Sequence, residues 1–125
     1  MKHAINWFEI PVSDIDRAKT FYEAIFGFEM HSMNLGDGLD MALFPSEPEG
    51  VGGSLIKNAD YYYPSDSKGP LVYLNANPDL QKVLDKVDKA GGEISIPKRQ
   101  ISPEHGFMGV IKDSEGNRIA LHSDE

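Results

Sequence analysis

The stretch that decides the fold is Ile5-Asn6-Trp7-Phe8-Glu9-Ile10-Pro11-Val12, because it opens a pattern that the chain contains twice. The apolar residues Phe8, Ile10 and Val12 occupy every second position, and this two-residue period is typical of a half-buried strand. These three side chains therefore share one face of the strand, and Trp7 points to the opposite face.

An amphipathic helix and three more strands are expected in this first half. Ser13 is a favourable N-cap, and Asp16 three residues later resembles a capping box. Apolar residues then recur at helical spacing until Gly27, which ends the helix. The strands are expected at Phe28–Asn34, Asp40–Pro45 and Gly52–Lys57. Gly50-Val51-Gly52-Gly53 precedes a strand rather than a helix, which favours a bend that lets strands approach closely over a phosphate-binding loop.

The second half repeats the order of the first. A strand at Leu71–Ala76 is followed by a helix that begins at Pro78, with Asn77 as its N-cap, and ends at Gly91-Gly92. The last three strands are expected at Glu93–Ile101, Gly106–Lys112 and Arg118–Ser123. Two βαβββ halves imply a cleft between or within curved sheets, and the residues that line this cleft decide the function.

The two halves give a single α+β domain that spans residues 1–125. The first module covers about 3–58, the linker about 58–69 and the second module about 70–125. Three adjacent tyrosines, Tyr61 to Tyr63, lie in the linker. They are interpreted as a cover over core or over a subunit interface, and a lid over a ligand is the alternative.

Composition narrows the classes of function. The net charge of −8 disfavours nucleic acid, because phosphate binding relies on clustered Lys and Arg. The chain has no cysteine, which fits a cytoplasmic protein. No charged segment followed by an apolar run is present at the N-terminus, so no signal peptide is expected. No apolar run approaches the roughly 20 residues of a membrane helix.

Two motifs carry a resemblance to a known family. The opening Val12-Ser13-Asp14-Ile15-Asp16-Arg17-Ala18, with Phe21-Tyr22 and Phe26-Gly27, and the closing Asp113-x-x-Gly116-Asn117-Arg118-Ile119-x-Leu121 resemble the vicinal oxygen chelate superfamily. This superfamily includes glyoxalase I, bleomycin-resistance proteins and extradiol dioxygenases, and the chain looks most like small bacterial proteins described as glyoxalase-related. The resemblance implies paired βαβββ modules that form a cupped mixed sheet, with the helices outside, and often a homodimer.

Enzymes of that superfamily hold a divalent metal with His, Gln or Glu from four strand positions. Carried over to this sequence, the positions fall on Trp7, Ser54, Val72 and Ala120. Indole, isopropyl and methyl groups do not ligate a divalent cation, and a neutral hydroxyl is a poor ligand. The sequence therefore predicts no metal site and no cofactor.

Two polar residues are candidates for a functional role in the cup in place of the metal ligands. Glu9 lies two residues beyond Trp7, and His122 two residues beyond Ala120, so both are expected to point into the cup. Burial tunes a carboxylate and an imidazole for acid–base chemistry. The alternative is that each is a separately hydrogen-bonded polar residue near the mouth. His105 is expected in a hairpin loop, as a surface residue or a gate.

The function expected from these residues is metal-independent binding of a small, partly aromatic or apolar molecule in the cup. The expected contacts are Trp7, Glu9, Ser54, Val72, Ala120 and His122. One alternative is a glyoxalase-like lyase or isomerase with Glu9 as general base and His122 as a second catalytic group. Another is a structural module without a ligand. Neither nucleic acid nor membrane is an expected partner, and no feature names the ligand.

Overall fold

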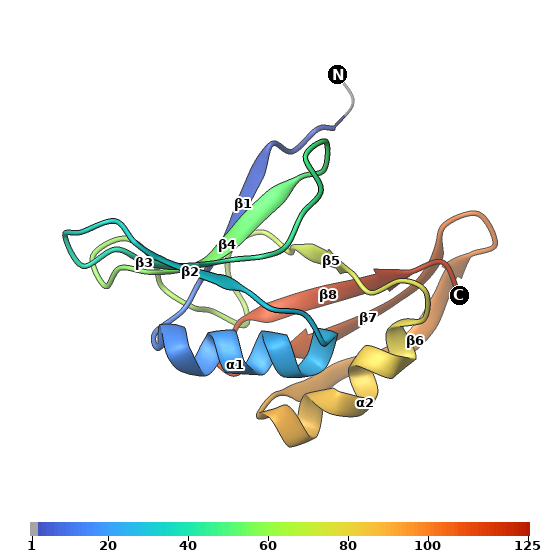
Figure 1. The fold of residues 1–125 in the computed structure, drawn as a ribbon. Helices are drawn as coiled ribbons and strands as arrows, with labels where there is room; N and C mark the ends of the chain where they lie inside the picture. The colour runs from blue at the N-terminus through green and yellow to red at the C-terminus, as the bar shows by residue number, and fades with distance from the viewer. Residues whose placement is uncertain (1–2) are drawn as a thin grey trace.

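The structure of the chain is a computed structural model that describes residues 3–125 (Figure 1). The first module contains β1 (Trp7–Pro11), α1 (Ile15–Phe26), β2 (His31–Asn34), β3 (Asp40–Leu43) and β4 (Gly52–Lys57). The second contains β5 (Tyr73–Asn75), α2 (Leu80–Ala90), β6 (Glu93–Ser102), β7 (Gly106–Lys112) and β8 (Arg118–Ser123).

Each module builds one four-stranded mixed sheet. The strand orders are β1-β4-β3-β2 and β5-β8-β7-β6. In both sheets the first strand is parallel to the last strand of its module, and the other pairs are antiparallel. The expected α+β class with two βαβββ modules is confirmed. Figure 1 shows both helices on the same side of the sheets, with the β1–β4 pair rising away from them.

Both helices start one or two residues later than expected. Asp14 is the N-cap of α1 and accepts a hydrogen bond from the N–H of Arg17, and Asp79 caps α2 in the same way through Gln81. The expected caps, Ser13 and Asn77, were therefore wrong. With lengths of 12 and 11 residues, α1 and α2 are too short to cross a membrane, and no other helix in the described part of the chain does so.

The strand bounds agree with expectation in three of the eight strands. β4, β7 and β8 have the expected ends. β2 and β5 are shorter than expected. The segment before β2 is held by an irregular contact, because the N–H of Met30 donates to the carboxylate of Glu23. Phe28 in this segment packs on Phe26 and Phe44 rather than continuing a ladder.

The core joins both modules. A single cluster of buried side chains is shared by the helix-facing sides of the two sheets and by the two helices. Its largest fully buried members are Tyr22, Phe21, Ile10, Ile25, Leu55, Leu80, Leu84, Ile111 and Leu121. Because residues of both modules lie in one cluster, the sheets are held in a defined relation to each other.

The turn between β7 and β8 fastens the second module to the first. The Arg17 guanidinium donates to both carboxylate oxygens of Glu115, at 2.7 and 2.9 Å. Glu115 also accepts from the backbone N–H groups of Ser13 and Asp14. Burial raises the pKa of Glu115, but the hydrogen bonds outweigh it and hold the pKa below its ordinary value.

A buried hydrogen bond lies behind this ion pair. The Tyr22 hydroxyl donates to Asp113 at 2.7 Å, and Asn117 donates to the backbone carbonyl of Pro11 at 2.6 Å. Burial raises the pKa of Asp113, although hydrogen bonds from Tyr22 and Asn117 oppose this shift. Asp113, Glu115 and Asn117 of the closing motif therefore have a structural role and join the two modules.

Candidate functional site

A cavity of about 760 Å³ lies between β1 and β5, which are edge strands of the two sheets. We call it the inter-sheet cavity. Most of its lining is aromatic or aliphatic. The lining residues are Ile5, Trp7, Phe8, Glu9, Phe26, Phe28, Phe44, Pro45, Val51, Pro70, Leu71, Val72, Tyr73, Leu74 and Asn75. Apolar walls with a few polar groups are typical of small-molecule sites.

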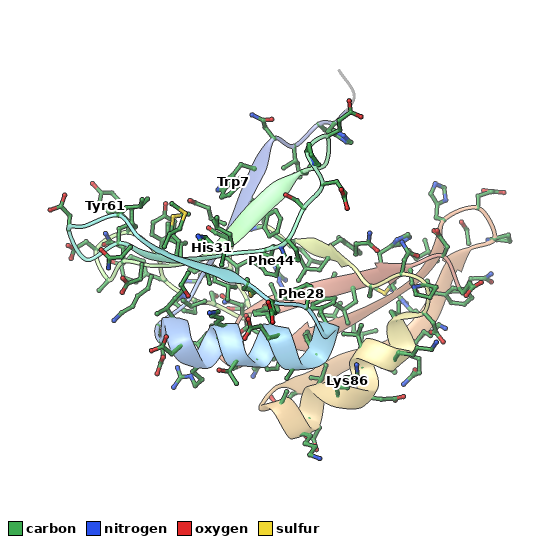
Figure 2. All side chains as sticks on the ribbon, in the orientation of Figure 1. Trp7, Phe28, His31, Phe44, Tyr61 and Lys86 are labelled. Carbon is green, nitrogen blue, oxygen red and sulfur yellow. The ribbon has the colours of Figure 1, made fainter. Side chains whose placement is uncertain are left out.

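One wall is a cluster of four phenylalanines from the first module. Phe8 and Phe44 have ring centroids 5.3 Å apart, and Phe28 lies 5.9 Å from Phe44 with its ring nearly perpendicular. Phe26 stacks on Phe28 at 5.2 Å. Figure 2 shows Phe44 and Phe28 between the β1–β4 pair and α1. Sequence reasoning did not assign these four residues to a site, because an apolar residue in a helix or strand pattern indicates core.

Trp7 lies beside this wall on β1 and is 46% exposed. Its ring lies over Gly52 of the paired strand, where an added Cβ would come within 2.9 Å of the ring. Phe8 lies even closer over Gly53, where an added Cβ would be 2.2 Å from the ring. The two glycines therefore make room for two aromatic rings. The glycine-rich stretch was expected to let strands approach closely, and the structure shows that the groups it admits are the rings of Trp7 and Phe8 on the paired strand.

Glu9 is fixed by a residue of the linker. The Tyr62 hydroxyl donates a hydrogen bond of 2.7 Å to Oε1 of Glu9. This bond raises the pKa of Tyr62, with burial as a second cause. Glu9 lines the inter-sheet cavity and also a second cavity of about 310 Å³ beneath the linker, which we call the linker cavity.

The three adjacent tyrosines thus have different environments. Tyr62 is half-buried against Glu9, whereas Tyr61 is 80% exposed and Tyr63 is 69% exposed. Tyr61 lies at the outer edge of the molecule (Figure 2). Tyr62 is the partner of Glu9 that sequence reasoning missed. All three line the linker cavity, and none of them lines the inter-sheet cavity.

Ser54 pairs directly with Glu9 across β1 and β4 and is fully buried. Its hydroxyl oxygen has no hydrogen-bond partner among the residues that the structure describes. A buried hydroxyl without a partner is energetically costly. In this arrangement Ser54 supports the sheet beneath Glu9 and is closed to solvent.

The second module places Leu71, rather than Val72, at the position that matches Trp7. Val12 donates to the carbonyl of Ile56, and Ala76 makes the equivalent bond to His122. This match shows that the second module has one additional residue between its first strand and its helix cap, Asp79. A count back from Asp79 with the spacing of the first module therefore reaches Val72 instead of Leu71. Leu71 packs with Ala120 on the open face of the second sheet, and Val72 packs toward the main core.

His122 lies in a different place from Glu9. It lines an open cavity of about 460 Å³ with Tyr73, Asn75 and other residues of the second module. Its Nε2 is 2.6 Å from the backbone carbonyl of His105, which is in the turn between β6 and β7. The structure therefore gives Glu9 and His122 separate hydrogen-bond partners and does not bring them into one cavity.

The superfamily metal positions carry a donor set that does not fit a divalent cation. They hold Trp7, Ser54, Leu71 and Ala120 in the register of the structure. Only Ser54 contributes an oxygen, and a neutral hydroxyl is a weak ligand without carboxylate or imidazole company. Within residues 3–125, no three His, Asp or Glu side chains are grouped closely enough to hold a metal ion.

Comparisons with solved structures support this architecture. The chain is 16% identical to the trypanothione-dependent glyoxalase I of Leishmania major, with 98% of this chain and 88% of that chain covered and a TM-score of 0.72. It is 13% identical to a glyoxalase/bleomycin resistance protein from Albidiferax ferrireducens, with 97% and 98% covered and a TM-score of 0.69. A glyoxalase-related enzyme from Fulvimarina pelagi is 12% identical, with 98% and 88% covered and a TM-score of 0.66.

These low identities show a shared fold. No curated protein matches the chain significantly. The sequence pattern of one family, however, covers residues 4–121, which is nearly the whole chain. The chain therefore belongs to the Glyoxalase/Bleomycin resistance protein/Dioxygenase superfamily.

Proposed function

We propose that the chain binds a small molecule with an aromatic or apolar body in the inter-sheet cavity, without a metal at the superfamily position. The observation that carries this proposal is the lining of the cavity, which combines an exposed Trp7 and four phenylalanines with Glu9. Aromatic walls supply contact area, and a few polar groups orient the ligand. The side chains at the superfamily metal positions are poor ligands for a divalent cation, which supports ligand binding without a metal.

Each residue of the site has a role in this proposal. Trp7 stacks on the ligand, and Glu9 orients it while Tyr62 holds Glu9 in place. Val72 contributes to the wall. Ser54 and Ala120 are fully buried and form the support beneath the wall. His122 lies at the neighbouring open cavity, where it would contact only a ligand that extends past β5.

A fragment screen tests the proposal, because Trp7 is the only tryptophan in the chain. Aromatic fragments should quench its fluorescence and raise the melting temperature. A ligand at a hundredfold excess over its Kd adds about 2.7 kcal/mol of stability. Trp7→Phe should keep the fold and weaken the hits by several-fold. If no fragment both changes the fluorescence and raises the melting temperature, the structural module without a ligand becomes the better account.

A second candidate function is a lyase or isomerase reaction with Glu9 as the general base. The hydrogen bond from Tyr62 favours it, because this bond holds the carboxylate in a defined direction beside an apolar cavity. Glu9→Gln separates the two candidates once a ligand is found. A binding protein would lose a few-fold in affinity, whereas an enzyme would keep its binding and lose turnover.

We also propose that the chain forms a homodimer. β1 and β5 are sheet edges, and edge strands need a partner or a cover. Large apolar side chains on or beside them are exposed, with 58% for Ile5, 46% for Trp7 and 52% for Tyr73. Light scattering at micromolar concentration should give about 28 kDa, twice the 13.8 kDa of one chain. A mass near 13.8 kDa would contradict the dimer.

A further inference from the structure

The charged groups that line the inter-sheet cavity are of one sign, negative. Among residues 3–125, Glu9 is the only charged side chain in the lining, and no Lys, Arg or His of this part of the chain borders the cavity. The other lining residues with polar side-chain groups are Trp7, Tyr73 and Asn75, all of them neutral. An anionic ligand would therefore meet a carboxylate and no compensating cation.

The charge of Glu9 is left uncompensated on this side of β1. Its hydrogen-bond partner, Tyr62, is a neutral phenol, and no ion pair to Glu9 occurs within the described residues. Two cations, Lys68 and Arg118, border the linker cavity, which Glu9 also lines, and neither of them lines the inter-sheet cavity. Arg118 donates to the backbone carbonyl of Gly69 at 3.0 Å, and neither it nor Lys68 forms an ion pair with Glu9.

The aromatic walls add a second reason to expect a cation. Six aromatic residues line the cavity, namely Trp7, Phe8, Phe26, Phe28, Phe44 and Tyr73. The face of an aromatic ring carries negative electrostatic potential and attracts a cation within about 6 Å of its centroid. The net charge of −8 also raises the local concentration of cations around the molecule.

From these observations we infer that the inter-sheet cavity selects an organic cation, in which an ammonium group is joined to an aromatic or apolar body. The ammonium group lies against Glu9, and the body packs on Trp7 and the phenylalanine wall. This inference rests on the proposed function, because it names the chemical class of the ligand at the same site. Tyr62 orients the carboxylate without neutralising it.

A series of four probes of similar size tests the charge preference. The probes are benzylammonium, benzyltrimethylammonium, benzyl alcohol and benzoate, each titrated at pH 7 by calorimetry and by Trp7 fluorescence. Both cations should bind at least tenfold tighter than benzyl alcohol, and benzoate should show no binding in the same range. Benzyltrimethylammonium has no N–H donor, so its binding reports the charge and the aromatic faces rather than a hydrogen bond.

Glu9→Gln supplies the matched variant. It keeps an oxygen acceptor for Tyr62 and removes the charge, so benzylammonium should lose about tenfold in affinity while benzyl alcohol is unchanged. Glu104→Gln is the control, because Glu104 is an exposed carboxylate in the turn between β6 and β7. This control removes the same charge from the whole molecule and should leave both affinities unchanged.

The outcomes distinguish this inference from the proposed function. If all four probes bind equally, or if Glu9→Gln and Glu104→Gln have the same effect, the charge preference is wrong and the cavity still binds aromatic compounds. If benzoate binds best, the inference is also wrong. If none of the four probes binds, and no fragment in the wider screen does, both the inference and the proposed function fail.

Discussion

The hydroxyl of Tyr62 donates a hydrogen bond to Oε1 of Glu9 at 2.7 Å, although the two residues are 53 positions apart in the sequence. The bond joins the linker to the first strand of the first module. Glu9 lines both cavities, whereas Tyr62 lines only the linker cavity. Tyr62 is therefore a positioning residue for the carboxylate that faces the inter-sheet cavity.

The first prediction concerns this bond. Tyr62→Phe removes the donor and should lower the free energy of unfolding by about 1 kcal/mol, which is the usual net value of one hydrogen bond. Urea denaturation measures the change. Tyr61→Phe is the control and should change stability by less than about 0.5 kcal/mol, because Tyr61 is 80% exposed. Equal effects in the two variants would show that the bond to Glu9 contributes nothing.

The second prediction is that Ser54→Ala stabilises the chain. The Ser54 hydroxyl is fully buried and has no partner among the described residues, so its removal relieves a desolvation penalty of about 1 kcal/mol or more. Thermal and urea unfolding should both show the gain. Ser67→Ala, at an exposed position of the linker, should be near neutral. A loss of stability in Ser54→Ala would mean that the hydroxyl has a partner after all.

The third prediction compares the two glycines beneath the aromatic rings. In Gly53→Ala the new methyl group would lie 2.2 Å from the ring of Phe8, which packs against the core, so we expect a loss of about 1–3 kcal/mol from overpacking. In Gly52→Ala the contact is 2.9 Å to the half-exposed Trp7, which has room to move.

Gly52→Ala should therefore cost less stability than Gly53→Ala but shift the emission of Trp7 and weaken the binding of aromatic fragments. Fluorescence spectra and urea denaturation of both variants test this order. If Gly52→Ala destabilises the chain more than Gly53→Ala, the Trp7 ring is held more rigidly than the Phe8 ring, and the expected order is wrong.

The fold was predictable because both halves of the chain show the same order of local sequence patterns for strands, a helix and turns. β4, β7 and β8 have the expected ends, and glycine-containing turns or bends lie next to them in the sequence. The helix caps were displaced because Ser13 and Asn77 are also good capping residues, and only tertiary contacts decide between neighbours. Glu115, about a hundred residues away, holds the N–H groups of Ser13 and Asp14 and sets this helix start.

The candidate site was predictable only in part. Alternation along the first strand assigned Trp7 and Glu9, and both line the inter-sheet cavity. Tyr62 was missed, because no local pattern signals a partner across so long a separation. Val72 was placed one residue away from the true match, Leu71, because an extra residue before the second helix alters the count.

The last prediction uses the pH dependence of the Glu115 fastener. The pKa of Glu115 is lower in the folded chain than its ordinary value of 4.5, so its ion pair stabilises the fold above that pH. This contribution is lost as the pH falls through the lowered pKa, because protonation removes the charge that Arg17 binds. The raised pKa of Asp113 acts in the opposite sense: its contribution is present below 3.8 and is lost as the pH rises through the raised pKa.

Glu115→Gln isolates the first effect from the second, since Asp113 is unchanged in the variant. At pH 7 the variant should be less stable by about 2 kcal/mol, the range of a hydrogen bond to a charged group. The difference from the original chain should shrink as the pH falls below 4.5, so it should be smaller at pH 3 than at pH 7. Urea denaturation at pH 7, 6 and 3 avoids precipitation near the pI of about 4.9. Glu29→Gln, at an exposed position, should show no difference at any of these pH values. A Glu115→Gln deficit that stays constant down to pH 3 would mean that shape, rather than the charge of Glu115, holds the two modules together.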